Sequence, residues 1–485
     1  MGFSIQDAFS AVFLWKKPTP ETEARGDASL DEGLRLALDA LCQLPENRTG
    51  LSGQRLQTIA TENVQRVSET LHSLQISQWK QEDTGAWVHR PRTYIILHNL
   101  NLVHLMNNFV QDGSTDLLLP YNDVTLPEYI QPQAMRELFL EVQKYLLTDA
   151  RVLEDLTAGV SSTKVLPHIH LSDGGNRHFK RLRMLGKGSF GYYEPNSNLS
   201  MVEEVYSCLS HKRYARKTVV RSRTNGPAQK DLVKELEALK SLSHRHLVKV
   251  LGSYTDTYHI AYLMLPVAQG NLDDLLRKPG GLADSDKHDV RSFFGCLAGA
   301  ANYLHRSRIR HRDLSLKNIL VHDGSVFISD FGSAYKWAGS NNQGSVTQHH
   351  NVPATRFYMA PEIARNAARN SSSDMWSLGV IFLEMTTVLV GRTLTQLQSK
   401  LSDNLRQNIE PYLWANPRVV TDWLRILQEA NQGPAHDNEP LEWIRDLLHP
   451  TPKNRPTSGA LMESIHDTQS FHIFCCIDCQ SEFRD

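Results

Sequence analysis

Apolar residues recur at steps of three and four along the first third of the chain, which places them on one face of a helix. Stripes of this kind run through residues 30–44, 56–74 and 135–156. Between the second and third stripes, the dense apolar run RPRTYIILHNLNLVHLMNNFV (residues 90–110) predicts a buried helix. We therefore expect residues 1–160 to form an α-helical domain.

The pattern changes after this region. Residues 161–179 are rich in serine, glycine and proline and predict a linker. From residue 180 to residue 468, short apolar runs with β-branched residues favour strands and then give way to longer helical patterns. These patterns predict an α+β fold in which a small β-rich lobe precedes a helical lobe, with residues 469–485 as a cysteine-containing tail.

Composition narrows the class of protein without identifying it. The 485 residues are 40% hydrophobic and 22% charged, as in soluble globular proteins, and the length allows two or three domains. A formal net charge of -1 argues against a strongly basic nucleic-acid-binding protein. The sequence lacks a secretory signal pattern and any stretch approaching the roughly 18 apolar residues of a transmembrane helix. We expect an intracellular, cytoplasmic protein, with the nucleus as the alternative.

The cysteines are too few to form a disulfide scaffold, since the chain contains six of them. Cys475, Cys476 and Cys479 lie close together near the C-terminus, and His472 is the histidine nearest to them in the sequence. A closed zinc site needs four ligands, so this segment offers at best half of one. We expect free thiols, with acylation and metal binding as the alternatives.

A glycine-rich segment is the first candidate for chemistry. GKGSFG (residues 186–191) has the spacing G-x-G-x-x-G, which lets the backbone approach phosphate oxygens because glycine has no Cβ. The motif is weak evidence by itself, since surface turns use glycine too. The residues that follow it along the chain decide its meaning.

Two motifs in the second half supply what phosphoryl transfer from ATP requires. IRHRDLSLKNILV contains Asp313 and Asn318 on a predicted loop, and FISDFGSA places Asp330 after a short apolar strand at residues 326–328. Asn318 and Asp330 offer the hard oxygen ligands that Mg²⁺ prefers. Asp313 can orient or deprotonate an attacking hydroxyl. One aspartate is usually a surface residue, but an ordered set of this kind is far less often accidental.

With these motifs in place, residues 180–468 resemble a eukaryotic protein kinase domain of the serine/threonine type. Further motifs of the family follow in its order: HRD at 311–313, DFG at 330–332, APE at 360–362, SSDMWSLGV with Asp374, and HPTPKNRPT with Arg455. The arrangement with a helical region in front resembles protein kinases from fungi. The resemblance implies a bilobal kinase fold, ATP and Mg²⁺ as cofactors, and protein substrates.

The resemblance also implies roles for individual residues. Lys217 in YARK would bind the α- and β-phosphates and pair with Glu235, and Arg455 would pair with Glu362. The implied catalytic residues are Lys217, Glu235, Arg312, Asp313, Lys317, Asn318 and Thr355. The implied ATP-binding residues are Gly186, Lys187, Gly188, Ser189, Phe190, Gly191, Val202, Ala215, Lys217, Met264, Leu265, Val267, Asn271, Leu320 and Asp330. The implied magnesium ligands are Asn318 and Asp330.

The glycine-rich segment departs from the family pattern, in which a valine stands two residues after the third glycine and the lysine follows some 15 residues later. Here Tyr193 occupies the valine position and Lys217 lies too far along. Removing YEPNSNLSM (residues 193–201) brings Val202 into that position and leaves Lys217 15 positions after it (217 − 202). We interpret these residues as a looped-out insertion, either a genuine one or an artefact of the gene prediction.

The catalytic loop departs from the pattern as well. Kinases of the serine/threonine type usually carry a lysine two residues after the catalytic aspartate, but here that position is Ser315 and a lysine stands at Lys317. We interpret this as a relocated cation. The segment VPATRFYMAPE still favours serine/threonine substrates, with Thr355 expected to touch the catalytic aspartate and Ala354 in place of the usual glycine.

Several functional alternatives follow from these departures. The main one is a pseudokinase that binds nucleotide and acts as a scaffold, and a small-molecule phosphotransferase of related fold is less consistent with the full motif series.

Arg312 favours regulation by phosphorylation of Ser345 or Thr347, which would order the loop through a charged pair. The N-terminal helical region is expected either to bind a regulatory partner or to be a structural appendage.

Overall fold

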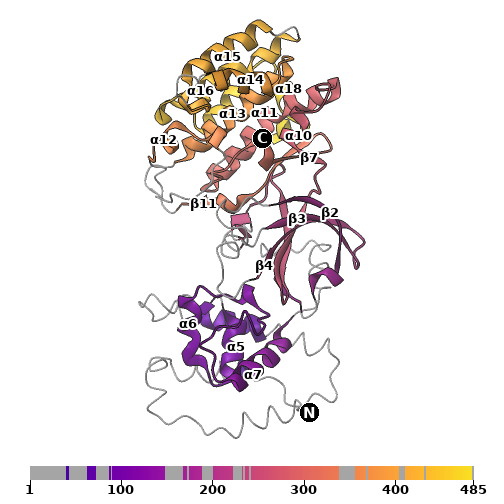
Figure 1. Cartoon of the computed structure of the whole chain (residues 1–485), viewed down its shortest axis with the longest axis vertical. Helices are drawn as coiled ribbons and strands as arrows, with labels where there is room; N and C mark the ends of the chain where they lie inside the picture. Colours follow the sequence, from indigo (N-terminus) through magenta and orange to yellow (C-terminus); the bar gives the residue numbers. More distant parts are fainter. Residues whose placement is uncertain are drawn as a thin grey trace. The chain divides into compact units, whose positions relative to one another are not determined.

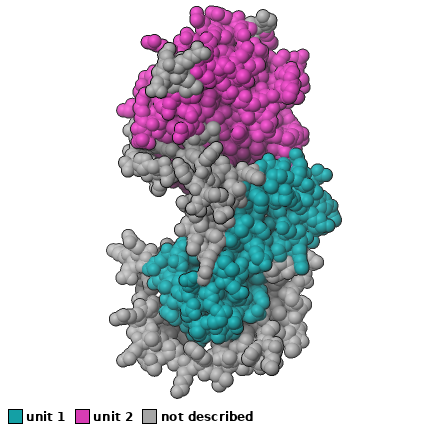
Figure 2. Space-filling view, viewed as in Figure 1, with its two compact units in different colours: residues 1–190, 195–230, 251–263 teal, residues 191–194, 231–250, 264–485 magenta. Residues whose placement is uncertain are grey.

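The computed structural model describes residues 40–42, 63–72, 87–88, 90–147, 168–171, 174–187, 200–221, 232, 235–236, 238–239, 242–337, 356–367, 370–403, 410–430 and 433–482. The chain divides into two compact units (Figures 1 and 2). Unit 1 comprises residues 1–190, 195–230 and 251–263, and unit 2 comprises residues 191–194, 231–250 and 264–485. Each unit is described by itself below.

The helical part of unit 1 contains α5 (Pro91–Asn99), α6 (Met106–Gln111) and α7 (Gln133–Gln143), with short 3-10 turns between them. An aromatic cluster fills their common core, where the rings of Phe109 and Phe139 stack with centroids 6.3 Å apart. Tyr129 meets Phe109 edge-on at 5.4 Å. The predicted helical character of this region is confirmed for the described residues, including the helix at residues 63–72. The stripe over residues 30–44 lies outside the described residues except for 40–42.

The prediction of one helix over residues 90–110 is wrong, because the segment forms α5 and α6 with a break between them. Asn101 adopts a left-handed conformation with φ of 56°, which ends α5. The amide of Leu102 donates to the carbonyl of Leu97 at 2.7 Å, and that of Asn101 donates to His98 at 3.1 Å. This is the Schellman arrangement, which satisfies the last carbonyls of a helix and needs glycine or asparagine at its left-handed position.

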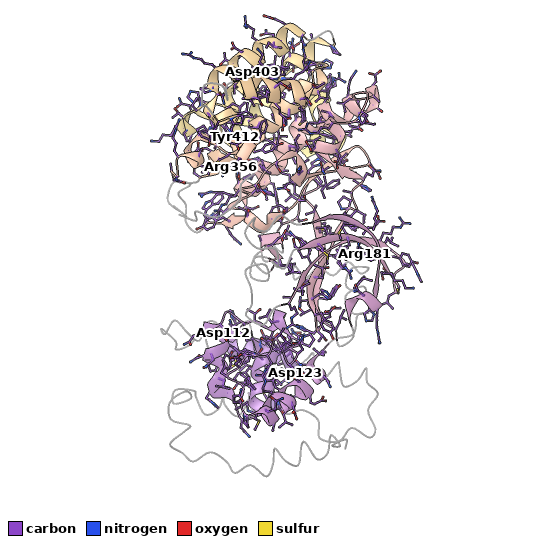
Figure 3. All side chains as sticks on the ribbon, viewed as in Figure 1. Asp112, Asp123, Arg181, Arg356, Asp403 and Tyr412 are labelled. Carbon is purple, nitrogen blue, oxygen red and sulfur yellow. The ribbon has the colours of Figure 1, made fainter. Side chains whose placement is uncertain are left out.

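A six-stranded sheet forms the rest of unit 1, in the order β1-β5-β6-β4-β3-β2. Its strands are β1 (His168–His170), β2 (Phe179–Lys187), β3 (Met201–Ser207), β4 (Arg213–Val220), β5 (Lys249–Thr255) and β6 (His259–Leu265). The first strand runs parallel to β5 at one edge, so the expected linker over residues 161–179 contains a strand of the sheet. Across β2, β3 and β4, Glu203 binds Arg216 at 2.7 Å and Arg181 at 3.1 Å. Figure 3 labels Arg181 on the sheet.

The segment before α7 contacts this sheet within unit 1. Arg221, at the end of β4, donates to the carbonyls of Leu118 and Pro120 and to that of Asp256 at 2.8 Å. Asn122 donates to the carbonyl of Thr257 at 2.8 Å. One buried guanidinium thus satisfies backbone acceptors from both parts of the unit, and burial lowers the pKa of Arg221 to about 10.

Unit 2 is mainly helical (Figure 1). Its helices are α10 (Leu272–Leu276), α11 (Asp284–Arg306), α12 (Pro361–Ala364), α13 (Ser371–Leu389), α14 (Leu394–Ser402), α15 (Pro417–Ala430), α16 (Pro440–Leu447), α17 (Ser458–His466), α18 (Phe471–Phe474) and α19 (Ile477–Glu482). The central helices α11 and α13 meet where Phe294 packs edge-on against Phe382 at 4.8 Å, and α13 is buried along most of its length. Burial of such aromatic side chains supplies much of the stability of a core.

Unit 2 also contains short strands, and its polar loops lie next to them. These strands are β7 (Gly270–Asn271), β8 (Ile309–Arg310), β9 (Ile319–His322), β10 (Ser325–Ile328) and β11 (Tyr335–Lys336). Strands β7, β9 and β10 form one antiparallel sheet, and β8 pairs with β11. The predicted strand at residues 326–328 is confirmed as β10. The expected order, a β-rich lobe followed by a helical lobe, is confirmed as well.

Candidate functional site

A buried carboxylate holds the HRD loop, which follows β8. Asp374, near the start of α13, accepts the amide of His311 through Oδ2 and the amide of Arg312 through Oδ1, each at 2.9 Å. The ring of His305 lies 3.1 Å from the same Oδ2. Burial alone would raise the pKa of Asp374, but the hydrogen bonds from His305 and from the Arg312 backbone outweigh it and keep the pKa below its usual value. The carboxylate therefore stays charged and fixes the loop.

Two non-glycine residues of the motifs have a left-handed backbone. The φ angle is 71° at Arg312 and 61° at Asp330. This conformation costs on the order of 1–3 kcal/mol per residue and persists where the surroundings hold it. Asp374 holds the first residue, as described above. Next to the second, the amide of Phe331 donates to the buried carboxylate of Glu235 at 3.1 Å.

Asn318, one of the two expected metal ligands, is hydrogen-bonded to the expected base, Asp313. Its side-chain amide nitrogen donates to the Asp313 carboxylate at 3.0 Å and to the Asp313 carbonyl at 2.7 Å. Because the nitrogen faces Asp313, the oxygen of the same amide points to the other side, where a hard cation can bind it. The donor types at Asn318 and Asp330 thus fit a magnesium ion.

Ser329 brings these two ligands together. Its amide and its hydroxyl both donate to the carbonyl of Asn318 at 2.9 Å, so the residue before Asp330 is joined to the backbone of Asn318. His311 donates through Nε2 to the carbonyl of Ser329 at 2.9 Å, and its ring packs on Phe331 with centroids 4.8 Å apart. The HRD and DFG motifs therefore form one hydrogen-bonded assembly within unit 2.

A small hollow lies beside this assembly in unit 2, lined by residues that include Asp313, Tyr358, Met359 and Ala360. Ser377 donates to the carbonyl of Tyr358 at 2.9 Å, and the Tyr358 hydroxyl donates to Glu384 at 2.7 Å. Burial raises the pKa of Glu384 to about 8. These bonds fix the segment before the APE motif next to the expected base.

The predicted pair of Glu362 and Arg455 is confirmed. Two parallel hydrogen bonds of 2.7 and 2.8 Å join the guanidinium to the carboxylate, and the Arg455 side chain is 0% exposed. Arg455 also donates to the carbonyls of Ser372 and His449 and stacks over Trp376 at 5.0 Å. A planar bidentate pair of this kind fixes geometry as well as charge.

The expected small-lobe ligands lie on adjacent strands of the unit 1 sheet. Val202 on β3 stands opposite both Gly186 on β2 and Lys217 on β4, and Ala215 lies two residues before Lys217. The excision of residues 193–201 concerned positions along the sequence, and the pairing places the same residues side by side in the sheet. The boundary differs by one residue, because Met201 already belongs to β3 and pairs with Lys187 and Thr218.

The expected adenine-binding segment runs from β6 to β9 in unit 2. Met264 is buried, Leu265 and Val267 are half-buried, and Leu320 pairs with Asn271 between β9 and β7. The Asn271 side chain accepts the amide of Asp274 at 3.0 Å and caps α10. Its role toward ATP stays a prediction, while its role as a helix cap is a structural one that sequence reasoning missed.

Other predicted residues are less constrained or lie outside the description. Lys317 is exposed on its 3-10 turn, and Ser315 is buried, so the usual lysine position carries no cation. Gly188, Ser189, Phe190, Gly191, Ser345, Thr347, Ala354 and Thr355 lie outside the described residues. His305 and Ser329 were missed, because a lone histidine on a helix and a serine before DFG carry no distinguishing pattern.

Comparison with known proteins agrees with this geometry. The profile of the protein kinase domain family matches residues 179–467. The chain therefore belongs to the protein kinase family. Among curated proteins, it is 29% identical over 228 residues to Serine/threonine-protein kinase 33 of Mus musculus, covering 44% of this chain and 43% of that protein.

Two further relatives are longer kinases. Mitogen-activated protein kinase kinase kinase 2 of Arabidopsis thaliana is 30% identical over 212 residues, covering 43% of this chain and 31% of that protein. Mitogen-activated protein kinase kinase kinase A of Dictyostelium discoideum is 26% identical over 225 residues, covering 45% and 22%. The chain spans less than half the length of these relatives. Among the described helices, none is long and apolar enough to cross a membrane alone, and the bent pair α13 and α14 passes that test jointly.

Proposed function

We propose that this chain is an active protein kinase that transfers the γ-phosphate of Mg²⁺-ATP to serine or threonine hydroxyls of proteins. The observation that carries the proposal is the Asp313–Asn318 hydrogen bond at 3.0 Å, joined through Ser329 to Asp330. It offers a carboxylate held for the acceptor hydroxyl beside two oxygen ligands for the metal. Phosphoryl transfer needs chiefly such positioning and charge neutralisation.

Each residue then has one task. Asp313 orients the hydroxyl and accepts its proton, Asn318 and Asp330 bind Mg²⁺, and Lys217 binds the α- and β-phosphates. When bound, Mg²⁺ neutralises the charge on the phosphates. Lys317 is exposed four residues after Asp313. Its ammonium group binds the transferring phosphate in place of the lysine that the family usually has where Ser315 stands. The proposal also gives Thr355, which lies outside the described residues, the role that the family pattern implies, next to the catalytic aspartate.

The serine/threonine class rests on two supports. Relatives such as the kinase from Mus musculus are named as serine/threonine kinases. The segment that ends in the APE motif also resembles the acceptor floor of that class, and Tyr358 in it is fixed by Ser377 and Glu384. ATP as donor and six free cysteines favour an intracellular location.

The alternative is a kinase-shaped scaffold that binds nucleotide without transferring phosphate. The observation in its favour is Ser315, which is buried and 3% exposed where the family usually has a lysine. The N-terminal helical region, docked on the sheet through Arg221, would then carry a regulatory partner. The presence of Asp313, Asn318 and Asp330 together argues against this alternative.

Phosphoryl transfer by the purified full-length chain separates the two functions. The chain is incubated with labelled Mg²⁺-ATP and a mixture of basic and acidic protein substrates, followed by phosphoamino acid analysis. We expect phosphoserine or phosphothreonine, and a loss of about 10³-fold in Asp313→Asn because the general base is removed. Phosphotyrosine would contradict the substrate class.

ATP binding is measured on the same preparations. Asp313→Asn should bind Mg²⁺-ATP as the wild type does, since the residue acts on the acceptor hydroxyl. Equal background transfer by wild type and variant, with ATP binding intact, would establish the scaffold. Absence of both binding and transfer would point to residues 193–201 as an insert that blocks the glycine-rich segment.

A further inference from the structure

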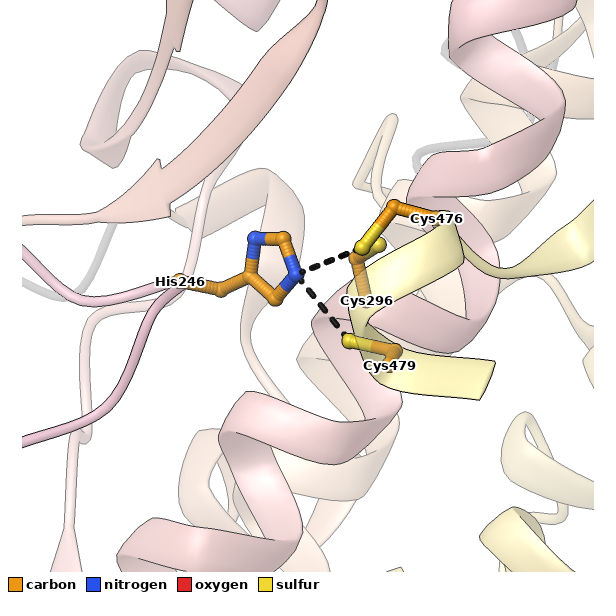
Figure 4. A group of neighbouring side chains, drawn as sticks. All are labelled: His246, Cys296, Cys476 and Cys479. Carbon is orange, nitrogen blue, oxygen red and sulfur yellow. Dashed lines mark hydrogen bonds between the residues drawn. The ribbon is translucent and has the colours of Figure 1, made fainter. Parts of the chain in front are cut away.

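Four side chains of unit 2 that are far apart in the sequence converge at one point (Figure 4). His246 lies in the loop before β5, Cys296 on α11, and Cys476 and Cys479 at the start and in the middle of the C-terminal segment that forms α19. Their ligand atoms all lie within 4.8 Å of one another. We propose that these residues form a structural Cys₃His zinc site.

Two of the distances between ligand atoms are close to those expected around a tetrahedral zinc ion. Bonds of about 2.3 Å to sulfur and about 2.05 Å to nitrogen place a sulfur and a nitrogen about 3.6 Å apart at tetrahedral angles. Nε2 of His246 lies 3.5 Å from Sγ of Cys476 and 3.2 Å from Sγ of Cys479. The ligand set is closed, with three sulfurs and one nitrogen, as structural zinc sites are.

The hydrogen bond of the His246 ring suits a metal ligand. Its Nδ1 lies 2.9 Å from the carbonyl of Val326, and a carbonyl can only accept. Nδ1 is therefore the donor, so in the neutral ring the lone pair lies on Nε2, which faces the sulfurs. A backbone carbonyl that orients a histidine ring in this way is a common outer partner of zinc ligands. The ring is 3% exposed, so it is held inside the protein.

The C-terminal segment is built to reach α11 closely. A Cβ on Gly295 would lie 2.0 Å from Sγ of Cys475 and 2.6 Å from the carbonyl of Phe474, so glycine is required there. Phe474 is buried and packs against Phe294 at 5.8 Å and Trp443 at 5.1 Å. This packing places Cys476 and Cys479 beside Cys296, the residue that follows Gly295 on α11.

The sequence prediction about these cysteines changes accordingly. His472 is exposed and is not one of the four residues, and Cys475 packs on Gly295 instead. None of the six cysteines forms a disulfide bond, and the proposed site takes up the metal-binding alternative for three of them. Zinc binding would release three thiol protons and leave a site of net charge −1 near Arg245, which pairs with Asp478 on α19 at 3.7 Å.

The site would join the C-terminal segment to the strand that precedes the DFG motif. The amide of Ile328 donates to the carbonyl of His246 at 2.9 Å, and the amide of Val248 donates to the carbonyl of Ile328 at 3.0 Å. Zinc would thus fix α11, α19 and the loop that supports β10. This inference does not rest on the kinase activity, because a metal of this kind stabilises the fold of a scaffold equally well.

Metal content of the full-length chain tests the site. Protein purified under reducing conditions is analysed by inductively coupled plasma mass spectrometry. We expect one zinc per chain in the wild type and in the control Cys208→Ser, which lies in the turn after β3 in unit 1. Cys479→Ser should lose most of its zinc, and circular dichroism reports whether that variant is folded.

A second measurement uses the wild type alone, so it does not depend on the folding of a variant. The chelator-treated protein is titrated with Co²⁺, and we expect the thiolate charge-transfer and strong visible bands of a tetrahedral cysteine site. Zinc should then displace the cobalt. Absence of both stoichiometric zinc and these bands would overturn the proposal, as would iron in place of zinc or equal zinc in Cys479→Ser and the wild type.

Discussion

The catalytic assembly and the cysteine-histidine cluster share one strand but differ in how the sequence encodes them. Residues 311–330 contain the HRD triplet, Asn318 and the DFG aspartate in one short stretch, and β10 lies just before that aspartate. The cluster needs His246 and Cys479, which are 233 positions apart, and it uses the Val326 carbonyl of the same strand. A site whose residues lie close together in recognisable motifs can be found from the sequence. A site whose residues come together only through packing can be found only once the fold is known.

Substitution of Asp330, the proposed metal ligand after β10, should separate the two sites most strongly. Asp330→Asn removes a negative oxygen from the proposed Mg²⁺ site, so we expect phosphoryl transfer to fall by about 10³-fold or more. Zinc content should stay at one per chain, because Asp330 does not belong to the cluster. Transfer assays and metal analysis on one preparation measure both effects.

Asp323→Asn is the matched control for this change. Asp323 lies in the turn between β9 and β10, also has a positive φ, of 45°, and is exposed. Asparagine tolerates that conformation, so activity should stay within about twofold of the wild type. Equal losses in the two variants would show that the hairpin, and not the metal ligand, is responsible.

Breaking the buried pair of Glu362 and Arg455 should lower the stability of unit 2, which contains both sites. Arg455→Ala leaves a buried carboxylate without its partner, which typically costs about 3–5 kcal/mol. Denaturant unfolding measures the change in the free energy of unfolding. The exposed pair of Arg277 and Asp273 provides the control, since Arg277→Ala should cost about 0–1 kcal/mol.

Glu384 should make the stability of the large lobe depend on pH. Its folded pKa of about 8 exceeds the ordinary value of 4.5, because burial and the nearby Asp273 outweigh Arg277. The folded state therefore holds a proton that the unfolded state has lost, and stability falls as pH rises from 4.5 to 8. Glu384→Gln mimics the protonated acid and keeps the acceptor for Tyr358.

The test compares unfolding free energies of the two proteins across this pH range. Relative to the wild type, Glu384→Gln should gain on the order of 3 kcal/mol as pH rises from about 5 to about 8. Parallel pH profiles would show that the carboxyl group stays ionised in the folded state. Neither outcome should change zinc content, because Glu384 is not among the four ligands.

The smallest expected effect concerns the approach of the C-terminal segment to α11. Gly295→Ala places a methyl group against Cys475 and Phe474 and should cost about 1–3 kcal/mol, with weaker retention of zinc under chelator competition. Gly299 lies one turn further on the same helix, where a Cβ would meet its nearest neighbour at 3.9 Å. Gly299→Ala should therefore leave zinc retention unchanged and stabilise the protein by up to about 1 kcal/mol. Identical behaviour of the two variants would contradict the docking of this segment.

The fold of the kinase region was predictable because local patterns and motif order agree. The apolar residues of α11 and β10 and the order of HRD, DFG and APE all point to one architecture. The break at Asn101 was not predictable from periodicity, because the apolar residues continue through it and a single left-handed residue ends the helix. Likewise β1 lies in a serine- and glycine-rich segment and becomes a strand because β5 offers it a free edge.

Within the site, residues that act through charge type and spacing were found, and residues that act by supporting them were missed. Asp313, Asn318 and Asp330 are recognisable from their chemistry. His305 and Ser329 matter because of where α11 and β10 bring them, which no local pattern records. Cys296 and His246 are the extreme case, since each is a lone residue in its own segment.

Single-turnover phosphoryl transfer tests most directly whether the assembly of Asp313, Asn318 and Asp330 transfers phosphate. Excess full-length protein is mixed with labelled ATP and Mg²⁺, and the rate of label appearing on protein is followed for the wild type and Asp313→Asn, with ATP affinity measured beside it. We predict equal affinity and a rate about 10³-fold lower in the variant. Equal rates at equal affinity would contradict this prediction and leave the chain as a nucleotide-binding scaffold.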